Sequence, residues 1–351
     1  MSRNDEAAAR VGGAVAGTAA TAGRTEFAFD SADGKSQVRA VLWVPLTMER
    51  TDSASGEPEL GCFKPRGVVQ LIHGMAEHID RYDDFARFLA DAGYLVAGHD
   101  HIGHGDTAGA PERRGVIDAE GGADAMIEDA QMLRLLVSQQ VASGTPYFIF
   151  GHSMGSLVLR SYLPRYGSGL AGAIICGTAN EPVAVSRAGN LAARAIARVR
   201  GDDYRSKLLD GMGVGAFAKQ IENPRTPHDW VCTDPAVVDA YIADELCGAM
   251  FSVGGYATLT DLTGEVVSPS CAAKVPKGLP VLFVAGAEDP VGACGKGVRA
   301  AADLLRRAGV RDVEVKLYEG MRHEILNEPG RAQVYTEVVG WIEEHACQST
   351  S

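Results

Sequence analysis

The feature that most constrains this chain is the segment YFIFGHSMGSL at residues 147–157. Its first four residues are apolar and typical of a buried strand, and residues 156–166 follow a helical pattern. Gly151-His152-Ser153-Met154-Gly155 therefore lies at a strand-to-helix turn, the context of a nucleophile elbow. Glycines suit this turn because a β-carbon would obstruct the approach of the two backbones. The pattern predicts a strained, exposed Ser153, but a motif this short is a hypothesis until partners are found.

Strand and helix patterns alternate along most of the chain. Two strands are expected first, near residues 25–30 and 37–44, joined by the turn Asp33-Gly34. Further strands are expected at 67–73, 95–98, 147–150, 170–176, 279–287 and 312–318, and helices at 121–142, 156–166, 295–308 and 329–346. This alternation predicts an α/β fold with a mostly parallel central sheet and helices on both faces.

Residues 179–275 interrupt the alternation, with helical patches, Gly/Pro punctuation and no clear buried strand. We therefore expect a flexible tail at 1–24, a first core part at 25–178, a mainly helical cap at 179–275, and a second core part at 276–351. The 351-residue length is compatible with one large core and an insertion.

Composition restricts the function classes. The net charge of -12 argues against nucleic acid as a partner, and no apolar run approaches the length of a membrane span. The N-terminal Ala/Gly/Thr stretch lacks the large aliphatic residues of a secretory signal, so it is interpreted as a disordered tail. The seven cysteines are scattered and include no C-x-x-C, which favours free thiols and a cytoplasmic location.

A serine nucleophile needs a base to take its proton and an acid to orient that base. Three histidines follow Ser153 in the chain: His228, His323 and His345. His228 lies in the expected cap, and His345 lies near the end of the last helix. His323 instead follows the last expected strand directly, at the edge where catalytic groups collect in parallel sheets. His323 is therefore the predicted base.

The same argument locates the acid. The strand at 279–287 is followed by Glu288, Asp289 and Pro290, and either carboxylate could lie over the sheet. Pro290 forces the residue before it into an extended conformation, which favours Asp289 over Glu288. The oxyanion donors of such a site are the amide after the nucleophile and one from the loop after the third strand. These are the backbone N–H groups of Met154 and Met75.

Five segments together resemble a known family. They are HGMAEH with RY (73–82), DHIGHGDT (100–107), GHSMGS (151–156), GAEDPVG (286–292) and YEGMRHEILNE (318–328). They are similar to the α/β-hydrolase group of monoacylglycerol lipases and lysophospholipases, sometimes grouped with serine aminopeptidases. The resemblance implies the α/β-hydrolase fold, a Ser153–Asp289–His323 triad, and an oxyanion hole at Met75 and Met154.

The resemblance also implies a serine carboxylester hydrolase that acts on a small acyl ester or lipid and needs no cofactor or metal. Peptidase and acyltransferase activities stay open, because the sequence does not fix the leaving group or the acceptor. Substrate-binding residues are expected in the cap, without further assignment.

Two alternative functions belong to other classes. The loop from His99 to Asp106 nearly spells a metal-ligand set, with His99, His101 and His104 as ligands of a metal-dependent hydrolase. Gly103 stands where that pattern needs an aspartate, so a structural role is preferred. The second rival is a non-catalytic α/β-hydrolase relative that binds a ligand. It predicts a missing triad residue, and none is missing.

The cap contains a basic amphipathic stretch between Arg187 and Lys207, with Leu191, Ala195, Ile196 and Val199 along one side. One hypothesis is a lid that makes transient contact with an anionic lipid surface. The preferred alternative is an ordinary lid helix, with its apolar side turned inward and its arginines solvated.

Overall fold

The computed structural model describes residues 23–45 and 64–348. Its centre is a sheet of eight strands in the order β1-β2-β4-β3-β5-β6-β7-β8. The strands are β1 (Arg24–Asp30), β2 (Gln37–Trp43), β3 (Val68–Ile72), β4 (Leu95–His99), β5 (Tyr147–His152), β6 (Gly172–Cys176), β7 (Val281–Gly286) and β8 (Val313–Tyr318). β2 pairs antiparallel with β1 and with β4, and all other pairs are parallel.

Both faces of the sheet are buried, which explains the continuous apolar runs of its central strands. Successive residues point to opposite faces, so that in β5 Ile149 joins one core cluster while Phe148 and Phe150 join the other. The first core includes residues of α3 (Gly122–Ser138), α4 (Met154–Tyr166) and α10 (Lys296–Arg307). The second includes residues of α2 (Asp83–Asp91) and α11 (Arg331–Gln348). The predicted α/β fold with helices on both faces is confirmed.

The turn from β5 into α4 requires a close approach of backbones. A β-carbon at Gly155 would meet the carbonyl oxygens of Ile72 and His73, at the end of the neighbouring strand β3. Gly340, on the exposed side of α11, has no atom near the position of its missing β-carbon. The first glycine is therefore required by packing, and the second is not.

The hairpin of β1 and β2 is tied to the core through a buried carboxylate on α3. Asp129 accepts hydrogen bonds from the Ser31 hydroxyl (2.7 Å) and the Ala32 amide (2.7 Å). Burial raises the pKa of Asp129 to about 6, more than these two hydrogen bonds lower it.

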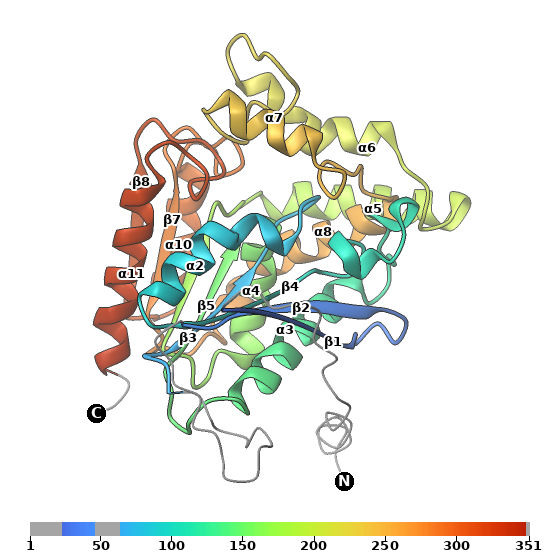
Figure 1. Ribbon diagram of the computed structural model, residues 1–351. Coiled ribbons are helices and arrows are strands. Elements are labelled where there is room, and N and C mark those ends of the chain that lie inside the picture. The colour runs from blue at the N-terminus through green and yellow to red at the C-terminus, as the bar shows by residue number, and fades with distance from the viewer. Residues whose placement is uncertain (1–22, 46–63, 349–351) are drawn as a thin grey trace.

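The segment between β6 and β7 is helical. It contains α5 (Val183–Arg200), α6 (Lys207–Met212), α7 (Pro235–Ala243), α8 (Val253–Val266) and α9 (Pro269–Ala272). Figure 1 shows α6 and α7 at one end of the molecule, away from the C-terminal end of α11. α8 packs against α3, α4 and α5 and contributes to the same core cluster as the sheet, so part of the expected cap belongs to the packed core.

The predicted elements agree with the observed ones to within a few residues at their ends. The helix expected at 156–166 begins earlier, at Met154, directly after the proposed nucleophile. The tail expected at 1–24 lies outside the described residues up to position 22, and Arg24 already belongs to β1. No helix in the described part of the chain is long and apolar enough to cross a membrane.

Candidate active site

Ser153 lies between β5 and α4 with a backbone conformation that residues other than glycine rarely adopt. Its φ is 54° and its ψ is -122°. Its amide donates to the Cys176 carbonyl at the end of β6 (3.0 Å), and its carbonyl accepts from the Ser156 amide (2.9 Å) and hydroxyl (2.5 Å). Surrounding structure thus holds a strained backbone in place, as the elbow motif predicts. The residue is half-buried, whereas both of its chain neighbours are buried.

Asp289 and His323 come from separate strand ends and meet. Asp289 follows β7 and His323 follows β8, and the two residues are 0% and 3% exposed. His323 Nδ1 lies 3.0 Å from Asp289 Oδ2, and Asp289 Oδ1 accepts from the Val291 amide at 2.9 Å. With Nδ1–H donating to the carboxylate, the Nε2 atom of His323 is left as the basic nitrogen. Glu288, the other candidate acid, is exposed.

His323 lies beside the elbow. Its ring centroid is 4.7 Å from that of His152, the residue before Ser153, and a β-carbon at Gly177 would be 3.2 Å from its Cε1 atom. No hydrogen bond joins Ser153 to His323 among the described residues. Contacts of this kind are often long without substrate and shorten when it binds.

The loop after β3 lies against Ser153. A β-carbon at Gly74 would be 3.0 Å from Ser153 Cβ, so glycine there leaves room for the nucleophile. The amides of Met75 and Met154, the two predicted oxyanion donors, have no hydrogen-bond acceptor within the described chain. Both N–H groups can therefore donate to a new acceptor.

The carboxylate of Glu77 holds this loop from the core side. Glu77 Oε1 accepts from the Gly74 amide (2.5 Å) and the Tyr82 hydroxyl (2.8 Å), and Oε2 accepts from Arg81 (3.0 Å). Arg81 also pairs with Glu324, the residue after His323. Burial opposes ionisation of Glu77, but the hydrogen bond of His152 and the charge of Arg81 hold its pKa well below the usual range.

His152 completes this buried group. Its Nδ1 lies 2.9 Å from the Tyr82 hydroxyl and 3.4 Å from Glu77 Oε1, and its Nε2 lies 3.3 Å from the His323 carbonyl. Burial alone would lower the pKa of His152, but the hydrogen bond and charge of Glu77 outweigh burial and raise the pKa. Two carboxylates, an arginine and an imidazole therefore form a buried layer of charged and polar groups behind His323, and a small pocket opens among them.

The loop from His99 to Asp106 packs against His73 in an arrangement that indicates a structural role. His73 Nδ1–H donates to the Gly74 carbonyl (2.7 Å), and His73 Nε2 accepts from the His101 amide (3.0 Å). Burial lowers the pKa of His99 and His104 to about 4, so both are neutral at pH 7. Within the described residues, two groups of side chains bring three possible metal-ligand atoms within 4.8 Å of one another. Neither group includes a histidine of this loop. The geometry that the metal-hydrolase alternative requires is therefore not found there.

The cap reaches the site through Trp230. Its ring centroid lies 5.1 Å from that of His323, and the neighbouring Val231 carbonyl accepts from the Glu324 amide (2.8 Å). Trp230, Val231 and Val291 share an apolar cluster, so this cap segment touches the loops of both His323 and Asp289.

The packing of α5 differs from the preferred interpretation. Its buried positions include Ala193 and Ala197, which allow close contact with α8, whereas Leu191 and Val199 are 71% and 81% exposed. The prediction of an inward apolar side is wrong for these two residues. Small residues, rather than large apolar ones, mark the packed side of this helix.

Comparisons with known proteins agree with this architecture. Residues 63–330 match the family model described as serine aminopeptidase, S33. A monoacylglycerol lipase of Mycolicibacterium smegmatis is 32% identical over 283 residues, covering 80% of this chain and 89% of the relative. A human monoglyceride lipase is 25% identical over 282 residues, covering 79% and 82% of the two chains.

Among solved structures, a thermostable carboxyl esterase from Bacillus coagulans superposes with a TM-score of 0.81 at 32% identity, covering 93% of this chain and 100% of the other. The family model matches well over half of the chain, and its range contains Ser153, Asp289, His323 and the whole cap. The chain is a hydrolase that belongs to the serine aminopeptidase S33 family of α/β hydrolases, with the monoacylglycerol lipases among its relatives.

Proposed function

We propose that this protein is a serine carboxylester hydrolase that cleaves acyl esters of the monoacylglycerol or lysophospholipid type. The observation that carries the proposal is the hydrogen bond between His323 and Asp289, placed beside a serine with φ 54°. The esterase and lipase relatives support an ester as the substrate.

In the proposed mechanism, the Ser153 hydroxyl attacks the ester carbonyl while His323 Nε2 takes its proton. Asp289 stabilises the resulting imidazolium, and the amides of Met75 and Met154 bind the oxyanion. The tetrahedral intermediate collapses to an acyl-serine, and the departing alcohol takes the proton from His323. A water molecule then attacks the acyl-enzyme, again with His323 as base, and releases the carboxylic acid and free Ser153.

The cap supports a lipid as the substrate. Leu191 and Val199 are exposed on α5, on the same helix as the exposed residues Arg187, Arg198 and Arg200. Exposed apolar side chains among cations are suited to the surface of an anionic lipid aggregate. We therefore include transient contact between this cap helix and lipid in the proposal. The proposal also includes a cytoplasmic location, because the structure has free thiols at Cys176, Cys232, Cys247, Cys271 and Cys294.

A panel of substrates tests the proposal. Wild type and Ser153→Ala should be assayed on monoacylglycerols, lysophospholipids, short-chain esters and aminoacyl amides. We expect hydrolysis of the esters by wild type, a loss of at least about 10³-fold in the variant, and a normal thermal unfolding midpoint for both.

Substantial ester hydrolysis by Ser153→Ala would reject the mechanism. Preferential cleavage of the amides would instead favour the peptidase alternative, and transfer of the acyl group to an added alcohol would favour the acyltransferase one.

A further inference from the structure

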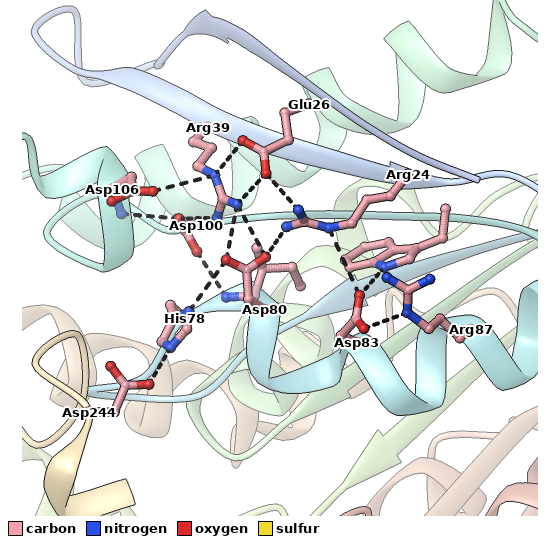
Figure 2. A network of polar contacts seen from close by, with 12 residues as sticks. Arg24, Glu26, Arg39, His78, Asp80, Asp83, Arg87, Asp100, Asp106 and Asp244 are labelled. Carbon is pink, nitrogen blue, oxygen red and sulfur yellow. Dashed lines mark hydrogen bonds and ion pairs between the residues drawn. The ribbon is translucent and has the colours of Figure 1, made fainter. Parts of the chain in front are cut away.

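A second cluster of chemically reactive side chains joins the cap to the loop that carries Met75. His78, Asp244 and Cys247 bring one ligand atom each within 4.8 Å of one another. His78 Nε2 lies 2.8 Å from Asp244 Oδ2, a contact that Figure 2 shows at the edge of a network of ion pairs. We propose that these three residues form a site for a thiophilic divalent transition metal ion, with Zn²⁺ as the fitting ion.

The donor set suits zinc chemically. An imidazole nitrogen, a carboxylate oxygen and a sulfur are all ordinary Zn²⁺ ligands, whereas Mg²⁺ and Ca²⁺ prefer oxygen donors alone. Three protein ligands leave a fourth tetrahedral position open to water. Asp244 and Cys247 are half-buried and His78 is buried, so an ion can enter from solvent and still be largely enclosed.

The backbone around the cluster is already ordered. The Cys247 amide donates to the Asp244 carbonyl (3.0 Å), and the Leu246 amide donates to Asp244 Oδ1 (2.8 Å), so a tight turn fixes the two cap ligands relative to each other. The next amide, that of Gly248, donates to the Ala76 carbonyl on the core side (2.9 Å). The cap and core parts of the site are therefore held in register without an ion.

The second ring nitrogen of His78 faces a carboxylate. Its Nδ1 is buried without a hydrogen bond, and Asp80 Oδ2 lies 3.9 Å from it. A carboxylate behind a ligating imidazole fixes the tautomer that presents the other nitrogen to the metal. Figure 2 places His78 between Asp80 and Asp244 in this way.

Two neighbouring effects determine how the ion would bind. A cysteine binds a metal as its thiolate, so binding at Cys247 releases the thiol proton and Zn²⁺ affinity should rise with pH. Arg81 is the nearby cation, and it forms ion pairs with Glu77 and Glu324.

Metal titration of the full-length, chelator-treated protein tests the site. We expect about one equivalent of Zn²⁺ by calorimetry, and with Co²⁺ a sulfur-to-metal charge-transfer band that reports the Cys247 thiolate directly. Loss of a group that only supports a metal ligand usually lowers metal affinity about 10–100-fold, and loss of a ligand itself should cost more. Cys247→Ser and Asp244→Asn should therefore each lower the Zn²⁺ affinity by about 100-fold or more. Hydrogen exchange of residues 241–252 should slow when Zn²⁺ is added to wild type.

Two matched controls separate this site from its competitors. Cys294→Ser removes an exposed thiol, and Asp312→Asn disrupts the other cluster with ligand-like spacing, formed by Asp312, Glu314 and His345. Both variants should bind like wild type.

Absence of the charge-transfer band in wild type, or an unchanged Zn²⁺ affinity in Cys247→Ser, would overturn the proposal. So would a loss of binding confined to Asp312→Asn. The metal-free unfolding midpoints of Cys247→Ser and Asp244→Asn show whether each variant is folded, and binding is measured independently of ester hydrolysis.

Discussion

Replacing Asp289 by asparagine tests the core of the proposed mechanism with almost no change of shape. The side chain is fully buried, and its two oxygens have different partners: Oδ1 accepts from the Val291 amide at 2.9 Å, and Oδ2 lies 3.0 Å from His323 Nδ1. In Asp289→Asn, the amide oxygen is favoured to stay on the Val291 amide, because turning it away would leave two N–H groups facing each other. The NH₂ group then faces His323 and forces Nδ1 to accept a hydrogen bond. Nε2 carries the proton in that tautomer and cannot act as a base.

The size of the effect depends on which of two orientations the new amide group takes. With the wrong tautomer, the analogous substitution in a serine protease lowers kcat about 10⁴-fold, which corresponds to about 5.5 kcal/mol. With the amide turned, the tautomer is kept, but the unpaired buried donor costs about 1–3 kcal/mol, or roughly 5–150-fold. The expected loss for Asp289→Asn therefore lies between about fivefold and 10⁴-fold, close to the upper limit if the Val291 contact is kept.

Steady-state hydrolysis of a p-nitrophenyl ester measures this loss, and thermal unfolding verifies that the variant is folded. Glu288→Gln is the matched control, since Glu288 is adjacent in sequence but exposed, and its activity should stay within about twofold of wild type. An Asp289→Asn enzyme with more than about half of wild-type activity would refute the assigned role, as would a larger loss in Glu288→Gln.

Three further predictions follow from packing, burial and exposure. Because the pKa of Asp129 is raised to about 6 in the folded protein, its carboxyl group contributes up to about 3 kcal/mol to the free energy of unfolding. This contribution is fully present below about pH 4 and is lost as the pH rises through about 6. Asp129→Asn should remove this loss and be more stable than wild type at pH 7 in urea unfolding; equal pH dependence in both proteins would contradict the assignment. Gly155→Ala should lower the free energy of unfolding by about 3 kcal/mol or more, because backbone carbonyls block a β-carbon, whereas its control Gly340→Ala should raise it by about 1 kcal/mol. Leu191→Asp should weaken binding to anionic vesicles about tenfold in co-sedimentation, while Leu135→Asp on α3 should leave it unchanged; equal binding by all three proteins would remove the lipid contact.

The main elements of the fold and the three proposed catalytic residues could be predicted because their signals are local. A parallel sheet collects the ends of its strands at one edge, so Asp289 and His323 could be placed from two apolar runs and the residues after them. Pro290 then distinguished Asp289 from Glu288, and the structure has Asp289 buried against His323 with Glu288 exposed. None of these steps required knowledge of a distant contact.

The charged layer behind His323 could not be predicted in the same way. Arg81 and Glu324 are 243 positions apart, and a charged residue is usually solvent-exposed, so nothing in the sequence around either residue indicates a buried pair. Glu77 and Arg81 at a spacing of four were the one local signal. The exposure of Leu191 is hard to predict for a related reason, because the side of α5 that is buried is marked by Ala193 and Ala197, and α8, against which α5 packs, is more than fifty positions away in the sequence.

Other distant contacts join the cap to the loop that carries Met75. Ala76, next to Met75, has a φ of 55°, which costs free energy unless its surroundings fix it. Its carbonyl accepts from the Gly248 amide (2.9 Å) and the Tyr241 hydroxyl (3.1 Å), both in the cap, while the Gly74 amide on the other side of Met75 donates to Glu77 in the core. The loop that presents the proposed oxyanion donor is thus held in place from two directions, one of which belongs to the cap that would contact the substrate. In the proposed mechanism, a change in the position of the cap would also change the support of the Met75 amide, so we expect substrate entry and transition-state stabilisation to be coupled.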